Sequence, residues 1–276
     1  MNTLDQIVLP DGSVKKLGNN PTPAGLLRAF PVYGTVPNTP LVPQSEWKDR
    51  IDQMGNDWSD PYLGPVHDQN GYGMCNASAT ASAMEYQRAV QGLQYTPISA
   101  GDLYMRICWN GGDNGSTLED GIKAAMDQGV ASVPVVPYLD WRGENPGARE
   151  DRKKYRVLEA FLCPTAEHVM SAVLNKFSIV SGIWWYDSYS RLDQDGWLPQ
   201  PAGNRGGHAV HGYKPAYRTV GGQTQYGIRH KNSWTPGWGV KGLCVFPLSV
   251  YQSHDIGGWW ACRSVVDEGN VLPVTR

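Results

Sequence analysis

QNGYGMC, residues 69–75, decides the fold, because it leads directly into a helix-forming run that continues to about residue 90. That run is rich in alanine and other small residues, so we expect a central, closely packed helix that begins at Cys75. Unpaired backbone N–H groups and the dipole at a helix N-terminus favour a cysteine thiolate. Gln69 lies six residues upstream, across a glycine-rich turn, and can direct its amide to the same place. The stretch therefore suits acyl transfer, which needs a nucleophile and a hydrogen-bond donor for an oxyanion.

Composition excludes several classes of function. At 276 residues, with 41% hydrophobic and 18% charged residues, the chain can bury a large core as one domain or as two lobes. Its net charge of −2 argues against nucleic acid as the main partner. The sequence has no apolar run of the roughly 18 residues that a membrane helix needs, and residues 1–17 do not resemble a secretory signal. We expect a cytoplasmic or virion-associated protein without a membrane partner.

The cysteines do not form the pattern of a disulfide framework. Their number is odd and they are widely scattered, at positions 75, 108, 163, 244 and 262. We interpret them mainly as buried free thiols of a reducing compartment. Cys244 and Cys262 both lie in strand-like segments, and a disulfide between them stays open as an alternative.

Residues 1–40 differ from the rest of the chain. A small hairpin is predicted to turn at Asp11-Gly12, and closely spaced prolines then prevent helix formation as far as residue 43. We expect an arm that either lies over the body of the protein or reaches a partner, in a homo-oligomer or a larger assembly.

The remaining pattern predicts an α+β fold with two lobes. Further helices are expected over 118–128 and 166–175, the first introduced by Ser116 and Thr117 and ended by Gly129. Strands dominate the second half, at 178–184, 209–213, 226–231, 242–246 and 259–266. A helical first half followed by a strand-rich second half is typical of α+β proteins.

Two histidines stand close together in GGHAVHG, residues 206–212. Side chains alternate faces along a strand, so His208 and His211 point in opposite directions and cannot share a metal ion. Gly206 and Gly207 leave room for a substrate backbone to pass, which favours His208 as the functional histidine and Gly207 as a substrate contact.

The segment KNSWTPGWG, residues 231–239, can supply a partner for that histidine. Asn232 can accept a hydrogen bond from the imidazole of His208 and fix its orientation, the role of the third group beside a nucleophile and a base. Trp234 can shield this hydrogen bond from water. The alternative interpretation is a tryptophan-rich turn that belongs to the core.

With its motifs in the order Gln, Cys, His, Asn, the chain resembles the papain-like cysteine peptidases. In that family His and Asn follow the nucleophile at about this separation. Here His208 follows Cys75 by 133 residues and Asn232 follows it by 157. The resemblance covers roughly residues 41–265 and includes segments 41–52, 64–69, 118–130 and 137–138. It implies a peptidase domain over 41–276, with a helical lobe at about 60–160, a β-rich, barrel-like lobe at about 161–270, and the active site in a cleft between them.

The resemblance also implies roles for individual residues. Cys75 would be the nucleophile, His208 the base and later the acid, and Asn232 the residue that orients His208. Gln69 would form the oxyanion hole with the Cys75 backbone N–H. The substrate would be a peptide or protein held near Gly207, Trp234 and a glycine of the helical lobe, for which Gly115 is favoured over the alternative Gly111-Gly112. Neither a metal nor an organic cofactor is required.

Four features depart from the family pattern, the mildest being Thr235-Pro236 where Gly-Thr commonly follows the tryptophan. Tyr72 stands where the family usually has a disulfide-bonded cysteine, and Asn76 replaces the tryptophan that normally follows the nucleophile. The proline-rich arm is shorter than the family's partly helical inhibitory prosegment and does not look like one. Asn76 and the unusual arm support an alternative, in which the fold serves as a structural or assembly component, for example of a phage or virus particle, with reduced or no proteolytic activity.

Overall fold

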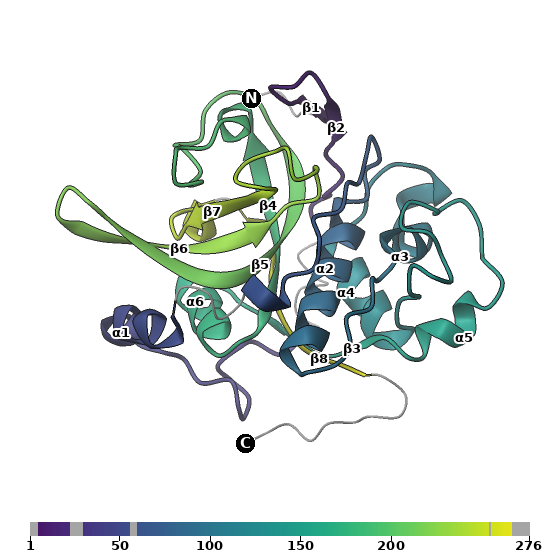
Figure 1. Ribbon diagram of the computed structural model, residues 1–276, viewed down its shortest axis with the longest axis horizontal. Coiled ribbons are helices and arrows are strands. Elements are labelled where there is room, and N and C mark those ends of the chain that lie inside the picture. Colours follow the sequence, from purple (N-terminus) through teal and green to yellow (C-terminus); the bar gives the residue numbers. More distant parts are fainter. Residues whose placement is uncertain (1–4, 23–29, 56–59, 254, 267–276) are drawn as a thin grey trace.

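A computed structural model describes residues 5–22, 30–55, 60–253 and 255–266 of the chain. A mainly helical part lies beside a mainly β part (Figure 1). The α-helices are α1 (Gln44–Met54), α2 (Cys75–Val90), α3 (Ala100–Ile107), α4 (Leu118–Asp127), α5 (Ala148–Arg152), α6 (Ala166–Leu174) and α7 (Val250–Ser253). Short 3-10 helices lie at Asp60–Tyr62, Trp109–Gly111 and Asp187–Ser190. The predicted α+β fold is therefore confirmed.

The β part is one antiparallel sheet of six strands, in the order β3-β8-β4-β5-β6-β7. Its strands are β3 (Arg156–Leu162), β4 (Ser178–Tyr186), β5 (Arg205–Val220), β6 (Gln223–Lys231), β7 (Leu243–Pro247) and β8 (Asp255–Val266). The helix predicted from Cys75 matches α2, whereas α3 and β3 were not predicted. β3 pairs with β8 at the far end of the chain, a partner that no local pattern indicates.

Helix α2 forms the centre of the molecule. Its residues are buried from Cys75 as far as Arg88, and it packs against α3 and α4 on one side and against β4, β5 and β8 on another. Alanine and serine predominate along it because neighbours approach from several directions and leave little room for long side chains. The N-terminus of α2, and with it Cys75, is thereby fixed between the two parts.

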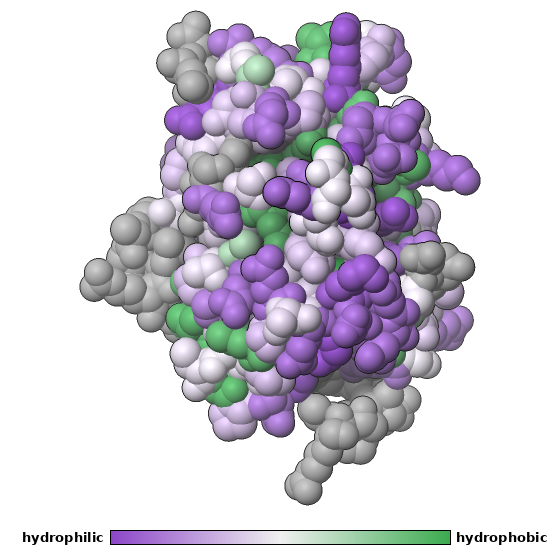
Figure 2. All heavy atoms as spheres, turned by 90° about the vertical axis from the view of Figure 1, so that its left-hand side faces the viewer, coloured by the Kyte–Doolittle hydropathy of each residue, from purple (hydrophilic) through white to green (hydrophobic). Residues whose placement is uncertain are grey.

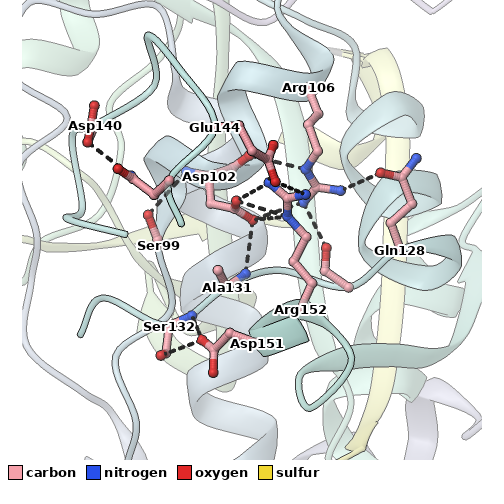
Figure 3. A network of polar contacts seen from close by, with 12 residues as sticks. Ser99, Asp102, Arg106, Gln128, Ala131, Ser132, Asp140, Glu144, Asp151 and Arg152 are labelled. Carbon is pink, nitrogen blue, oxygen red and sulfur yellow. Dashed lines mark hydrogen bonds and ion pairs between the residues drawn. The ribbon is translucent and has the colours of Figure 1, made fainter. Parts of the chain in front are cut away.

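A buried ion network holds the helical part together (Figure 3). Asp102 of α3 accepts hydrogen bonds from Nε and Nη2 of Arg152 at 3.0 and 2.6 Å, and a further one from the Ala131 backbone N–H at 2.9 Å. Arg106 pairs with the same carboxylate at 3.2 Å. The network ties α3 to α5 and to the long loop between α4 and α5.

The N-terminal region is part of the folded body. β1 (Gln6–Val8) and β2 (Val14–Lys16) form the predicted hairpin. Tyr33 is fully buried, and its hydroxyl accepts a hydrogen bond from Asn175 at 2.9 Å. Of the two expectations for the arm, the structure shows a segment that lies over the body, and Tyr33 joins the core cluster that also includes α6.

On the face shown in Figure 2, the described apolar residues form small separate patches among hydrophilic ones. Within the described part of the chain, no helix is long and apolar enough to cross a membrane.

All five cysteines are free, so the alternative of a Cys244–Cys262 disulfide is wrong in this structure. Both thiols lie within the packed sheet, on strands β7 and β8 that are not neighbours in it.

Candidate active site

Cys75 begins α2, as predicted, but its thiol is fully buried. Burial raises the pKa of the thiol to about 11, although hydrogen bonds with the backbone of Gly18, Ala209 and Asn76 act in the opposite direction. The expectation of a thiolate is therefore not met in this conformation, because loss of water outweighs the favourable helix N-terminus.

His208 lies on β5 and is also fully buried. Its Nε2 is 2.8 Å from Oδ1 of Asn232, and the indole of Trp234 stacks on the imidazole with ring centroids 4.4 Å apart. Nδ1 has no hydrogen-bond partner among the described residues. Burial lowers the pKa of His208 to about 4, against the smaller opposing effect of Asn232. The imidazole is thus neutral, with one nitrogen fixed by Asn232 and the other available.

Cys75 and His208 lie on elements that pack together, because α2 contacts β5. Cys75 and Ala209, the residue after His208, belong to the same buried core cluster. Trp234 is fully buried and belongs to a core cluster, as the alternative interpretation expected, and its indole stacks on the His208 imidazole.

Gln69 is held by partners on both sides of its amide. Its Oε1 accepts a hydrogen bond from the Ser233 hydroxyl at 2.6 Å, and its Nε2 donates to the Tyr72 carbonyl at 2.8 Å. The backbone N–H of Gln69 also donates to the Ser233 carbonyl at 2.9 Å. Ser233 therefore fixes the orientation of the amide, a role that the sequence did not reveal.

The second histidine of the pair has a different environment. The two ring nitrogens of His211 lie 2.9 Å from the Ser82 hydroxyl and 3.0 Å from the Ser178 hydroxyl. The prediction that His208 and His211 point in opposite directions agrees with these contacts. No group of three or more potential metal ligands occurs among the described residues.

Asn76 and Asp113 hold the segments next to Cys75 in place. Asn76 donates from Nδ2 to the Ser116 carbonyl at 2.7 Å, so it anchors the loop before α4. Asp113 accepts hydrogen bonds at Oδ1 from the Gly73 N–H at 2.8 Å and from the Tyr104 hydroxyl at 2.7 Å. These contacts fix the turn that precedes Cys75 without a disulfide.

Residues 15–20, here called the cleft segment, cover this site. The Lys16 carbonyl accepts a hydrogen bond from Gln69 Nε2 at 3.0 Å, and the backbone of Gly18 hydrogen-bonds to the Cys75 thiol. Asn19 forms a parallel bridge with Ser116, and its N–H donates to the Gly207 carbonyl at 3.0 Å. The segment is thus bonded to both walls of the site.

Glycine permits this close approach. A Cβ atom on Gly207 would lie 1.8 Å from the Asn19 carbonyl oxygen, and one on Gly115 would lie 2.3 Å from the Gly18 carbonyl oxygen. A Cβ on Gly18 itself would lie 1.9 Å from the Gly73 carbonyl oxygen. Gly115 and Gly207, the two glycines expected to contact substrate, therefore lie directly against the backbone of the chain's own cleft segment.

Together these observations define a cysteine–histidine–asparagine site, with a fixed amide donor, between a helical part and an antiparallel sheet. A family model described as papain family cysteine protease matches residues 54–255. The chain belongs to this family, and its fold and family support a thiol peptidase.

Solved structures support the fold. Xylellain, a cysteine protease from Xylella fastidiosa, is 20% identical with a TM-score of 0.60, over 96% of this chain and 99% of that one. ProCathepsin B S9 from Trypanosoma congolense is 16% identical with a TM-score of 0.62, over 89% and 87%. Digestive procathepsin L 3 of Tenebrio molitor is 20% identical with a TM-score of 0.59, over 89% and 76%. A search of curated protein sequences gives no match.

Proposed function

We propose that the protein hydrolyses peptide bonds through an acyl-enzyme on Cys75 and that the described conformation is its self-blocked form. The Cys75 proton passes to Nδ1 of His208 while the sulfur attacks the substrate carbonyl carbon. The oxyanion receives hydrogen bonds from Gln69 Nε2 and the Cys75 N–H. The C–N bond then breaks, and the imidazolium of His208 gives its proton to the departing amine. Water, deprotonated by His208, hydrolyses the thioester and restores the thiol.

The contact between Lys16 and Gln69 carries this proposal. A peptide carbonyl lies at the side-chain amide of Gln69, next to the helix that begins at Cys75. Substrate hydrolysis needs this same approach, in which a carbonyl oxygen meets a fixed donor beside the nucleophile. Asn232 contributes by holding the imidazole of His208 at 2.8 Å.

The cleft segment is not itself arranged as a substrate. The Cys75 thiol is hydrogen-bonded by the Gly18 backbone, two residues beyond the carbonyl that faces Gln69. The sulfur therefore faces the backbone of Gly18. It does not face the carbonyl carbon of Lys16, which is the carbonyl that Gln69 binds. Catalysis requires the segment to leave, which also readmits water and favours the charged thiolate–imidazolium pair.

A structural or assembly role is the second candidate. It is favoured by the closed cleft and by the neutral, buried state of both Cys75 and His208. In that case the cleft segment would be a permanent part of the core rather than a removable cover.

Covalent trapping separates the two candidates. The full-length protein is incubated with a peptidyl vinyl sulfone, and the adduct is mapped by mass spectrometry over several hours, so that opening of the cleft is sampled. If the protein is a peptidase, we expect selective labelling of Cys75, and we expect His208→Ala to abolish this labelling. Cys108 is the internal control because it is the one partly exposed thiol among the five. If Cys75 reacts no faster than the other four thiols, the catalytic proposal fails.

A further inference from the structure

Asp113 is a carboxylate fixed at the wall of the cleft. Its Oδ1 accepts from the Gly73 N–H and from the Tyr104 hydroxyl, and that hydroxyl also accepts from the Gly115 N–H at 3.1 Å. Both glycines border the cleft segment. The carboxylate is therefore held in one orientation by the same backbone that surrounds the proposed reaction site.

The other oxygen of this carboxylate binds a lysine of the cleft segment. The Lys16 ammonium lies 2.9 Å from Oδ2 of Asp113, and it also contacts the Asp113 carbonyl. The carbonyl of the same lysine accepts a hydrogen bond from Gln69 Nε2 at 3.0 Å. One residue thus presents its carbonyl to the proposed oxyanion donor and its positive side chain to Asp113.

We propose that Asp113 is a specificity residue that binds the Lys or Arg side chain of the substrate residue supplying the scissile carbonyl. This inference rests on the proposed peptidase function. When the cleft segment leaves, Oδ2 loses Lys16, while Oδ1 keeps both of its fixed donors. A basic substrate side chain then restores a charge-assisted hydrogen bond, which a neutral side chain cannot supply.

The surroundings of Asp113 suit a long basic side chain. The carboxylate side chain keeps 24% of its exposure even beside Lys16. It borders a recess of about 530 Å³ whose lining includes Tyr72, Met105 and Trp141. Such walls can pack against the methylene stem of lysine or the guanidinium plane of arginine. Arg142 also lines the recess, but its guanidinium lies over the Trp141 ring at 5.5 Å. Among the described residues, the ion pair of Asp113 is with Lys16 and not with Arg142.

The test uses full-length protein carrying Gly18→Val, which displaces the cleft segment, with and without Asp113→Asn. The asparagine keeps a carbonyl oxygen for the Gly73 and Tyr104 donors but removes the charge. Two peptides that differ only by Lys or Met at the residue supplying the scissile carbonyl are compared by kcat/KM. Asp127→Asn, at an exposed position of α4, is the matched control.

We expect the Lys peptide to be preferred by about 10- to 100-fold, the usual effect of a hydrogen bond to a charged group. Asp113→Asn should bring the Lys-to-Met ratio near one, whereas Asp127→Asn should leave it unchanged. Equal cleavage of both peptides by the parent, or a ratio that survives Asp113→Asn, overturns the inference while the peptidase proposal stands.

A binding measurement keeps the inference testable if no peptide is cleaved, which would count against the peptidase proposal. Fluorescence anisotropy with Gly18→Val/Cys75→Ala protein should give tighter binding of the Lys peptide, and Asp113→Asn should remove that difference. Equal affinity for the two peptides refutes the assignment of Asp113.

Discussion

Replacing Gly18 by valine should open the cleft. A Cβ atom at this position would lie 1.9 Å from the Gly73 carbonyl oxygen and 2.4 Å from the carbonyl carbon. Gly73 cannot easily move away, because its N–H is bonded to Asp113 at 2.8 Å. The added side chain therefore expels the cleft segment rather than shifting its neighbour.

The size of the effect follows from the contacts that are lost. Three backbone hydrogen bonds join the segment to the walls, from Asn19 to Gly207, from Asn20 to Ser116, and from Ser116 to Gly18. At about 1 kcal/mol for each hydrogen bond, their loss shifts the closed–open equilibrium by ~3 kcal/mol, or roughly 100-fold. The ion pairs of Lys15 with Asp68 and Lys16 with Asp113 act in the same direction.

The assay is the rate at which iodoacetamide alkylates Cys75, followed by peptide mapping. Gly18→Val should raise this rate by about 100-fold over the parent protein. Gly143→Val is the matched control, since a Cβ there meets no atom within 4 Å. An unchanged rate in Gly18→Val, with the fold intact by circular dichroism, would refute the reasoning that the segment protects the thiol.

Three further predictions concern the supports of the site. Asn232→Ala should lower kcat by about 10- to 100-fold with little change in KM, because His208 loses the hydrogen bond that orients it; steady-state kinetics in the Gly18→Val background measures this. Stability should fall as the pH drops from 6.5 toward 4, because the folded pKa of His208 is depressed to about 4 and the unfolded imidazole binds the proton first. The loss amounts to ~3 kcal/mol from this residue, and urea titrations at pH 7 and 4 should show a smaller loss for His208→Asn than for the parent. Asp102→Asn should destabilise the protein by about 3–5 kcal/mol, since the buried Arg152 loses its ion pair with this buried carboxylate and keeps only the half-exposed Glu144; a Tm equal to that of Asp127→Asn would contradict this.

Much of the site could be predicted because its residues lie in local patterns. Cys75 follows a glycine turn and begins a run of small residues, and that run became α2 with the predicted start. His208 and His211 were separated correctly by strand alternation, and the structure gives them different partners.

The rest depends on contacts between distant segments. Nothing near Asp113 in the sequence indicates that it bonds to Gly73, forty residues away. Ser233 orients Gln69 across a separation of 164 residues. The cleft segment was interpreted only as part of an arm, because its occupation of the site depends on the spaces beside Gly73, Gly115 and Gly207. The protonation state of Cys75 could not be predicted from the sequence either, because the rise in its pKa results mainly from burial.

The most direct test of the central claim is the hydrolysis of an unstructured peptide mixture by three forms of the full-length chain. The parent protein should cleave slowly, Gly18→Val should cleave about 100-fold faster in line with its more open cleft, and Gly18→Val/Cys75→Ala should not cleave. Cleavage that survives the loss of Cys75, or a Gly18→Val protein that is folded and open to alkylation yet cleaves nothing, would contradict the account.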